Sequence, residues 1–347
     1  MSQAGLKIAI LYDTWDDGVE EPTAPEMPPP PGERRPKAAH PPKLDRDEIF
    51  EALVELGHKP SYLVVDGNDP SLLAVARCKA DLIFNLTESY AGDDTKDVHL
   101  AAYLELLDKP YTGADPHGLY LAQDKSLAKK LFAFHNIRTP AFAVSYDGEL
   151  ENARAIGFPL IVKPVAEDGS IGIEAGSVVH GVKELKERIR RVHAEFDSPA
   201  LIEEYIEGRE IYAAILGDET PEALPLVEMD LSRLPRGTPR IASGAVKWEK
   251  GSDVYKRVRS RVVEDLDEKL VEKIRDRAIA AYRALELRDY GRIDLRLTGK
   301  GEIYVLEGNP NPWLSSGAEF AMAARASGRT YTDMLRDIVD LAMARYA

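Results

Sequence analysis

Cysteine is nearly absent from this sequence, since Cys78 is the only one among 347 residues. A single cysteine excludes a disulfide within one chain and a metal cluster built on several thiolates. Cys78 lies in the apolar stretch LLAVARCKADLIF, so we expect it to be a small buried hydrophobic residue.

Long apolar runs are also missing. No segment approaches the roughly 18 apolar residues that a membrane-spanning helix needs. The N-terminal stretch LKIAILY is too short for the apolar region of a signal peptide and lacks its cleavage pattern, so it is interpreted as a first strand. These absences predict a cytoplasmic protein with no membrane partner.

Positive charge is in deficit, with 45 Lys and Arg against 59 Asp and Glu and a net charge of −14. An acidic surface repels phosphate backbones, so we expect no nucleic-acid partner. The short basic clusters at 186–191 and 256–261 are interleaved with other residues and are interpreted as solvated faces.

Proline is unevenly distributed, because nine of the 23 prolines lie in residues 13–43. Such a segment cannot continue a helix or a central strand, so a long exposed loop is expected there. Around it, predicted strands (6–12, 61–66, 81–86) alternate with predicted helices (45–57, 69–78, 95–107). This alternation predicts an N-terminal α/β substrate domain with a parallel sheet over residues 1–118.

The length of the chain favours two or three domains, and two further units are expected at 119–205 and 206–347. The first combines helices at 119–136 and 181–194 with strands near 141–144, 158–164 and 199–206. The second has strands at 209–216, 223–230, 289–298 and 301–308, a weakly patterned stretch at 232–262, and helices at 266–286, 317–327 and 331–345. The fold class predicted is therefore mixed α/β and α+β.

The last two strands carry oxygen donors. Asp294 lies within the strand GRIDLRL, while Glu307 and Asn309 stand two apart in LEGNPNP. A hairpin whose register centres on Gly299–Lys300 would bring Asp294 near Glu307. Two carboxylates and a carboxamide suit a hard cation such as Mg²⁺. The alternative is a solvated hairpin with ordinary acidic residues.

A lysine and a glycine-rich loop follow the strand FPLIVKP. Lys163 comes directly after an apolar run, and the loop EDGSIGI begins four residues later. Backbone N–H groups of such a loop bind phosphate oxygens, although the pattern is neither a P-loop nor GxGxxG. Lys163 is thus interpreted either as a phosphate ligand or as a side chain that extends out of a sheet into solvent.

The segment EEYIEGRE supplies carboxylates around a glycine. Glu203, Glu204 and Glu210 could accept hydrogen bonds from an exocyclic amine and from ribose hydroxyls. A charged strand end before a turn explains the same residues equally well.

Together these motifs resemble a known superfamily. FNLTE…YTG, DK, FPLIVKP, GSIG, EEYIEGRE, AVKW, GRIDLRL and LEGNPNP occur in this order and cover nearly the whole chain apart from residues 13–43. The set resembles the ATP-grasp superfamily, and most closely its D-alanine–D-alanine ligase branch. The resemblance implies a three-lobed ATP-grasp architecture in which ATP lies between two sheets.

The resemblance also implies roles for individual residues. The triphosphate would contact Lys125, Lys163, Lys247 and a closing loop of Ser170, Ile171 and Gly172. Glu203 and Ile206 would meet the adenine and Glu210 the ribose, while Asp294, Glu307 and Asn309 would hold Mg²⁺, with two ions expected and Mn²⁺ able to replace them. Arg292, Lys247 and Ser170 would act on the reacting groups, with Arg292 facing the charge that develops on the acyl group.

The activity implied is ATP-dependent amide formation between a small-molecule carboxylate and a small-molecule amine through an acyl phosphate. Family members of this kind are commonly homodimers, and the same state is expected here. No Ser-His-Asp or Cys-His constellation is needed for this chemistry.

The substrate half departs from the D-alanine ligase pattern. Asp47 or Glu48 would take the place of the family's amine-binding acidic residue, and Trp248 stands where a tyrosine is expected. The stretch PNPWLSSGAEF puts Trp313 at a glycine position, with Ser315 and Ser316 beside it. A bulky indole would reshape the acceptor pocket, although packing in the core is the alternative for Trp313.

We therefore expect a ligase that acts on a pair of substrates other than two D-alanines. The alternatives are a D-alanine–D-alanine ligase proper, another ATP-grasp ligation such as that of glutathione synthetases or amino-acid carriers, and a non-catalytic nucleotide-binding regulatory protein.

Overall fold

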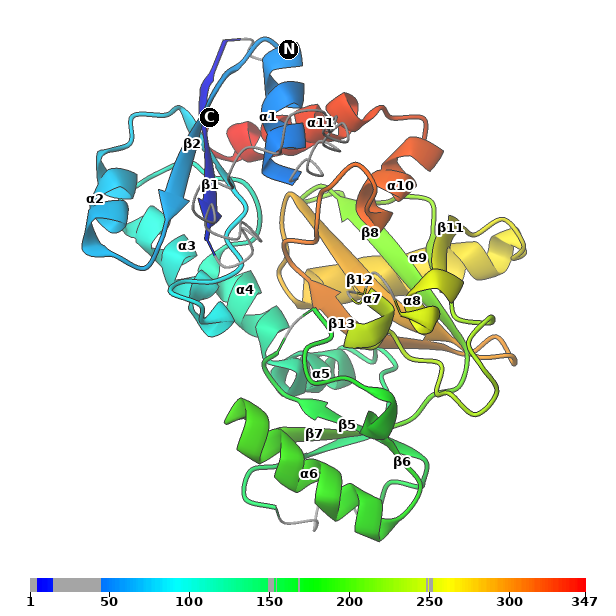
Figure 1. Ribbon diagram of the computed structural model, residues 1–347. Helices are drawn as coiled ribbons and strands as arrows, with labels where there is room; N and C mark the ends of the chain where they lie inside the picture. The colour runs from blue at the N-terminus through cyan, green and yellow to red at the C-terminus, as the bar shows by residue number, and fades with distance from the viewer. Residues whose placement is uncertain are drawn as a thin grey trace, which may run out of the picture.

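The computed structural model describes residues 5–14, 45–148, 153, 155–167, 169–247, 249 and 252–347. These residues form three lobes, each built on its own sheet (Figure 1). The mixed helix and strand content and the N-terminal parallel sheet agree with the fold class predicted from the sequence. Most of the proline-rich segment 13–43 lies outside the described residues, as does Trp248.

The N-terminal sheet has three parallel strands in the order β2-β1-β3, namely β1 (Lys7–Asp13), β2 (Lys59–Val65) and β3 (Leu82–Asn85). Alternate residues of β1 enter two different cores: Ala9 and Leu11 on one face, Ile8 and Ile10 on the other. Helices α2 (Asp69–Arg77) and α3 (Asp97–Leu106) contribute to the first core, and α1 (Asp45–Glu55) to the second. Burial on both faces explains the continuous apolar run of β1.

Two helices link this lobe to the next, where the sequence predicted one. They are α4 (Pro116–Gln123) and α5 (Lys125–Phe134). Asp124 separates them because its side chain accepts hydrogen bonds from Ser126 N and Leu127 N, which makes it the N-cap of α5. The boundary predicted at 118–119 therefore falls inside α4.

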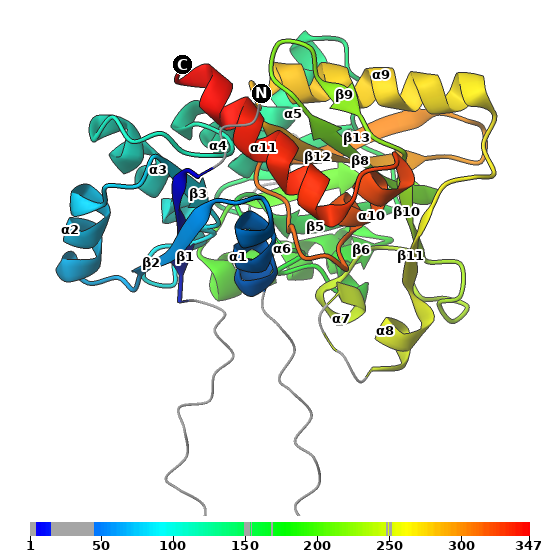
Figure 2. The ribbon, with the colours of Figure 1, turned by 90° about the horizontal axis from the view of Figure 1, so that it is seen from above.

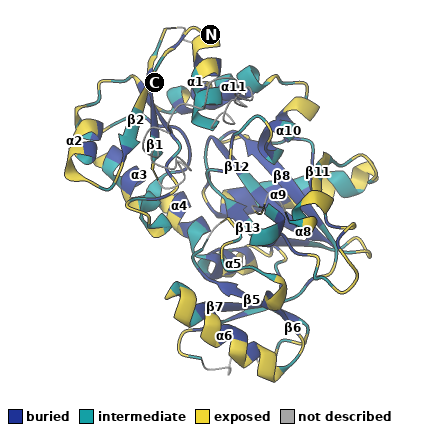
Figure 3. Ribbon diagram, in the orientation of Figure 1, coloured by how far each residue is buried: buried dark blue, intermediate teal, exposed yellow. Residues whose placement is uncertain are grey.

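The central lobe is a four-stranded antiparallel sheet in the order β4-β7-β5-β6. Its strands are β4 (Phe142–Ser145), β5 (Leu160–Pro164), β6 (Val178–Val179) and β7 (Ala200–Glu204). Helix α6 (Val182–Phe196) covers one face, and its outer side is exposed (Figure 3). Leu160, Val162, Ile202 and Leu185 form a core separate from those of the other lobes.

The C-terminal sheet has six strands, with β11-β10-β8-β12-β13 in order and β9 paired to β8. The strands are β8 (Arg209–Leu216), β9 (Glu222–Ala223), β10 (Val227–Asp230), β11 (Arg259–Val262), β12 (Tyr290–Leu297) and β13 (Ile303–Asn309). The weakly patterned stretch contains β11 and two short helices, α7 (Gly244–Lys247) and α8 (Asp253–Arg257).

Helices pack on both faces of this sheet and leave one end of one face uncovered. Ile293, Leu295 and Leu297 of β12 pack against α9 (Glu268–Ala284). On the other face Tyr212 and Tyr290 pack near α10 (Glu319–Ala326) and α11 (Tyr331–Arg345). Helix α11 lies between the N-terminal lobe and the C-terminal sheet (Figure 2). Both cores are thus shared by these two lobes, and only the central lobe has a core of its own.

Candidate active site

Strand alternation turns two buried charged residues of the central sheet away from its core. Leu160 and Val162 of β5 pack under α6, so Lys163 points to the opposite face. On β7, Ile202 faces the same core and Glu203 points the other way. The ammonium Nζ of Lys163 lies 2.8 Å from Glu203 Oε2, and both residues are buried.

The same rule applies to β12 in the C-terminal sheet. Ile293 and Leu295 face α9, so Arg292 and Asp294 lie on the opposite face. This face meets that of the central sheet: Glu307 Oε2 is 3.9 Å from Lys163 Nζ and 4.0 Å from Lys125 Nζ. The candidate site therefore lies between the central and C-terminal lobes, where the resemblance predicted ATP.

A β-bulge gives Glu307 its position. Leu297 pairs with Ile303 and Leu295 with Val305, but Asp294 pairs with Glu307, so Leu306 is the extra residue. A regular hairpin centred on Gly299–Lys300 would pair Asp294 with Val305, and the predicted register is therefore wrong in detail. Because of the bulge, Val305 enters the core beside Leu295, whereas Glu307 faces the site with Asp294.

The charged groups on this face shift one another's pKa values. Burial would raise the pKa of Glu307, but the cations Lys125, Lys163, Lys247 and Arg292 lower it to about 2. Burial raises the pKa of Asp294, and the charge of Glu307 adds to the rise while Arg292 opposes it. Arg292 donates to both oxygens of Asp294, from Nε at 2.7 Å and from Nη2 at 2.9 Å. Glu307 is thus an ionised carboxylate in a cationic surrounding.

The three predicted metal ligands fit a magnesium site by donor type. Asp294 is opposite Glu307 and Arg292 is opposite Asn309, so the three side chains share one face and one strand end. Asn309 donates Nδ2 to Arg292 O at 3.3 Å, which leaves its carboxamide oxygen for a cation. Within the described ranges no group of three His, Cys, Asp or Glu side chains could hold a metal, as expected for a site with only two carboxylates.

The predicted phosphate loop has the backbone that such a loop requires. Gly169, Ser170 and Gly172 all have positive φ, at 60°, 68° and 70°. A Cβ on Gly172 would lie 2.7 Å from Pro164 Cγ, so only glycine fits. Ile171 is exposed.

Two contacts hold this loop in position. Arg188 of α6 donates to Gly172 O at 2.5 Å and to Glu174 Oε1 at 2.6 Å. Gly244 N, at the start of α7, donates to Ile173 O at 3.0 Å. Since α7 ends at Lys247, the loop and the third predicted phosphate lysine are neighbours.

The residues predicted for adenosine lie around the hinge between β7 and β8. Both carboxylate oxygens of Glu203 form ion pairs with lysines, and Glu210 pairs with Arg296 at 2.7 Å. Ile206 is buried. The sequence did not anticipate these ion pairs, because each partner comes from a distant segment.

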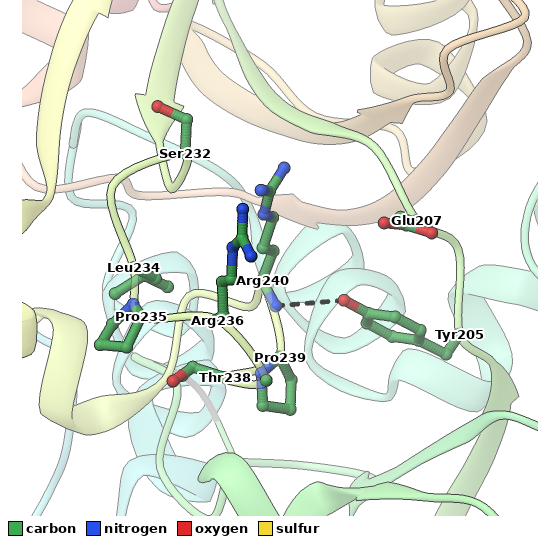
Figure 4. Close-up of a pocket in the computed structure, with 10 residues that line it drawn as sticks. Tyr205, Glu207, Ser232, Leu234, Pro235, Arg236, Thr238, Pro239 and Arg240 are labelled. Carbon is green, nitrogen blue, oxygen red and sulfur yellow. Dashed lines mark hydrogen bonds between the residues drawn. The ribbon is translucent and has the colours of Figure 1, made fainter.

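A cavity of about 400 Å³ opens beside this hinge (Figure 4). Tyr205 and Glu207 line it from the hinge, and Arg236 and Arg240 from the loop after β10. The hydroxyl of Tyr205 accepts a hydrogen bond from Arg240 N at 3.1 Å, which ties the loop to the hinge. None of the predicted phosphate or metal residues lines this cavity.

Three of the candidate substrate residues come together. Glu48 of α1 accepts hydrogen bonds from Ser316 N and Ser316 Oγ, both at 2.7 Å, and from Ser315 Oγ at 3.3 Å. Asp47 instead accepts from Tyr62 Oη at 2.6 Å. Of the two acidic candidates, only Glu48 thus forms described hydrogen bonds with the segment that follows the predicted metal ligands.

Trp313 is 47% exposed, so the alternative that it packs in the core is wrong. Its indole is a hydrogen-bond partner of Asp45, the first residue of α1. Burial raises the pKa of Asp45, while hydrogen bonds that include the one from Trp313 oppose the rise.

One buried lysine was missed in the sequence. Lys129 of α5 is fully buried, and its ammonium forms an ion pair with Glu203. The only signal was its spacing, since Lys129 follows Lys125 by four residues and therefore shares its helical face.

Comparisons with known proteins agree with this geometry. Residues 131–340 match the family model described as D-ala D-ala ligase C-terminus. A Sinorhizobium fredii protein called "Uncharacterized protein y4sG" is 32% identical over 308 residues, covering 86% of this chain and 88% of its own. A D-alanine--D-alanine ligase of Bordetella petrii is 31% identical over 301 residues, covering 86% of each chain.

Solved structures show the same fold. The D-alanine--D-alanine ligase of Bacillus anthracis complexed with ATP has a TM-score of 0.71 and 20% identity, with 98% of each chain covered. The VanG D-Ala:D-Ser ligase of Enterococcus faecalis has a TM-score of 0.71 and 20% identity, covering 97% of this chain and 99% of its own.

The fold and the family match together define an ATP-grasp enzyme, an ATP-dependent ligase that forms C–N bonds. Within that class the chain belongs to the D-alanine–D-alanine ligase family. Use of ATP and a divalent metal ion follows from this membership. No helix among the described residues is both long and apolar enough to cross a membrane.

Proposed function

We propose that this protein joins a carboxylate to an amine through an acyl phosphate, and that its substrate pair is not two D-alanines. The main support is the meeting of Lys163 and Glu307 across the two lobes at 3.9 Å. This contact brings a phosphate-binding lysine of the central lobe to a carboxylate suited to a metal ion. A triphosphate needs both partners at once.

The nucleotide roles follow the geometry of the site. Lys125, Lys163 and Lys247 surround Glu307 closely enough to lower its pKa, so a triphosphate at this point would meet all three cations. Ser170, Ile171 and Gly172 would close over the phosphates, and Glu203, Ile206 and Glu210 would line the adenosine end. Asp294, Glu307 and Asn309 would hold Mg²⁺, with two ions proposed and Mn²⁺ as a substitute. The bound metal would neutralise charge on the phosphoryl oxygens.

The proposed reaction has two displacements. A carboxylate oxygen attacks the γ-phosphorus of ATP, the bond to ADP breaks, and an acyl phosphate forms. The amine nitrogen then attacks the acyl carbon, a tetrahedral intermediate forms, and the C–O bond to phosphate breaks as the nitrogen loses a proton. Arg292 would stabilise the oxyanion of that intermediate, a kind of contact that typically contributes about 10²–10³ in rate.

The residues that would surround the amine substrate are the reason for proposing a pair other than two D-alanines. The exposed indole of Trp313 stands at the site-side end of the segment that continues to Ser315 and Ser316. Glu48 joins this segment to α1, so α1 and the loop would form the walls around the amine substrate. An indole there favours an amine larger than alanine, because it takes the volume of a small acceptor and offers an apolar wall.

The test measures phosphate release from ATP over a panel of amino acids and dipeptides, with mass spectrometry of the products. D-alanine is included in the panel. We expect amine-dependent release that is lost in Asp294→Asn and Glu307→Gln. Release with D-alanine alone would identify a D-alanine–D-alanine ligase, and ATP binding without turnover across the panel would identify a nucleotide-binding regulatory protein.

We also propose that the protein is a homodimer with small-molecule substrates as its partners. Light scattering coupled to size-exclusion chromatography measures its mass in solution directly, and a monomer would contradict the proposal.

A further inference from the structure

Lys129 is a buried cation for which the proposed reaction has no direct use. It has no exposed surface, and it extends from α5 into the space between the central and C-terminal lobes. Burying an ammonium group is costly unless its charge and its three protons are compensated. The groups that contact Lys129 therefore indicate its role.

Three protein groups surround the ammonium of Lys129. The ammonium pairs with Glu203 Oε1, donates to Thr139 Oγ1 at 2.8 Å and donates to Leu306 O at 3.2 Å. The ammonium has no exposed surface, and it makes two hydrogen bonds and one ion pair with protein groups. These contacts hold Lys129 inside the protein and away from a bound phosphate.

Lys163 has the opposite pattern. Among the described residues its one acceptor within hydrogen-bond distance is Glu203 Oε2 at 2.8 Å, since Glu307 is 3.9 Å away. Glu203 thus lies between Lys129, which is surrounded by protein groups, and Lys163, whose other protons remain available to a ligand. The two lysines lower the pKa of Glu203 against the effect of burial, so Glu203 is an anion.

The charges of these three residues decide what Lys163 can do. Lys129, Glu203 and Lys163 together carry one net positive charge. If Lys129 were neutral, Glu203 and Lys163 would form a neutral pair, and Glu203 would compete with phosphate for the ammonium of Lys163. With Lys129 present, Glu203 is compensated and the positive charge of Lys163 remains available to an anion.

The contact with Leu306 O adds a second effect. Leu306 is the extra residue of the bulge that turns Glu307 toward the site. A bulge removes its carbonyl from the regular ladder, and Lys129 supplies a donor for it. The ammonium of Lys129 thus contacts both Glu203, the partner of Lys163, and Leu306, the neighbour of Glu307.

We propose that Lys129 is a positioning residue for the nucleotide site: it compensates Glu203 so that Lys163 keeps its charge for the triphosphate, and it holds the bulge that orients Glu307. This inference rests on the proposed function, because it assumes that a triphosphate binds beside Lys163.

The test compares Lys129→Met with Lys130→Met, an exposed neighbour on the same helix that loses the same charge. Calorimetry measures the Kd of Mg·ATP, and circular dichroism and thermal melting verify the fold. We expect Lys129→Met to weaken ATP binding by about tenfold or more, as the loss of one nearby charge in a partly buried site implies. Lys130→Met is expected to bind like the wild type.

The double variant Lys129→Met/Glu203→Gln separates charge from packing. It restores one net positive charge, and the amide oxygen introduced at position 203 can still accept a hydrogen bond from Lys163. We expect the affinity for Mg·tripolyphosphate, which lacks the adenosine that Glu203 would contact, and the salt dependence of that affinity to return most of the way to wild type. A purely structural role for Lys129 predicts no such rescue.

Three outcomes would overturn the inference. Wild-type affinity in Lys129→Met contradicts it directly, and a double variant that binds Mg·tripolyphosphate no better than Lys129→Met contradicts the role of charge. A wild type that binds no Mg·ATP contradicts the proposed function as well. A wild type that binds Mg·ATP but forms no amide affects only the proposed ligation, and the comparison of affinities still decides the inference.

Discussion

Arg345, near the end of the last helix, donates two hydrogen bonds to the carboxylate of Asp289, which is completely buried. Asp289 also accepts from Gly113 N at 2.7 Å, and Arg345 donates to Tyr111 O at 2.9 Å. This ion pair of the C-terminal lobe thereby binds Tyr111 and Gly113 of the N-terminal lobe, in addition to the cores that the two lobes share. Burial raises the pKa of Asp289, and the nearby Asp218 adds to the rise while Arg345 opposes it.

Arg345→Met should therefore destabilise the protein strongly. It leaves Asp289 buried without its cation, and breaking a buried pair from one side typically costs about 3–5 kcal/mol. Urea unfolding measures the change. Arg336→Met on the same helix is the control, because the Arg336–Asp333 pair is partly exposed and is expected to contribute less than about 1 kcal/mol. Equal losses in the two variants would contradict the role of Asp289.

Arg188→Met should weaken the phosphate loop without unfolding the protein. Arg188 holds Gly172 O and Glu174 from α6, so its loss frees the loop that would cover the triphosphate. We expect KM for ATP to rise about tenfold, consistent with the loss of two hydrogen bonds to charged groups. Arg190→Met, an exposed change on the same helix, is the control. The prediction fails if both variants show the KM of the wild type.

We predict that His58 makes the free energy of unfolding depend on pH. Its ring is buried, and neither ring nitrogen has a hydrogen-bond partner among the described residues. Burial lowers the pKa of His58 below its usual 6.5, with a smaller opposing effect from Asp340. The unfolded chain therefore binds the proton more readily than the folded one, and stability falls as the pH drops through about 6.5.

The free energy of unfolding, measured by urea between pH 8 and 5.5, tests this. We expect a loss of about 1.4 kcal/mol for each unit by which the pKa differs between the folded and unfolded states. His58→Leu should remove that part of the pH dependence. An unchanged slope in the variant would show that other groups cause it.

Trp313→Gly should change the choice of amine and leave nucleotide binding intact. The indole is half-exposed beside α1 and is not among the residues near Glu307. We expect smaller amines to gain in kcat/KM relative to larger ones, with KM for ATP unchanged. Tyr146→Ala, which removes an exposed aromatic ring of the central lobe, is the control. A change in KM for ATP alone would contradict a role at the acceptor end.

Much of this molecule can be predicted from local patterns. The alternation of strands and helices before residue 107, the last hairpin and the two final helices are all present near the expected positions. Lys163 and Asp294 could be predicted to face the site, because an apolar neighbour on each side fixes which face is core. These predictions depend only on residues adjacent in sequence.

What could not be predicted depends on distant partners. Val305 and Glu307 stand two apart on one strand, yet one faces the core and the other the site, because Leu306 forms a bulge between them. No local sequence pattern marks this bulge. Lys129 is buried only because Glu203 and Leu306 O come to it from other lobes. Likewise Glu48 meets Ser316 from 268 residues away. The break at Asp124 is different, since aspartate before a helix is a local capping signal that the sequence offered.

The cap at Asp124 has a consequence for how this chain tolerates changes in length. Because α5 starts there, the cap fixes the angle at which the helix presents Lys125 and Lys129, one turn apart. One residue inserted after the cap would rotate both ammonium groups by about 100° around the helix axis, away from Glu307 and Glu203. The segment from Asp124 to Lys129 must therefore keep its number of residues.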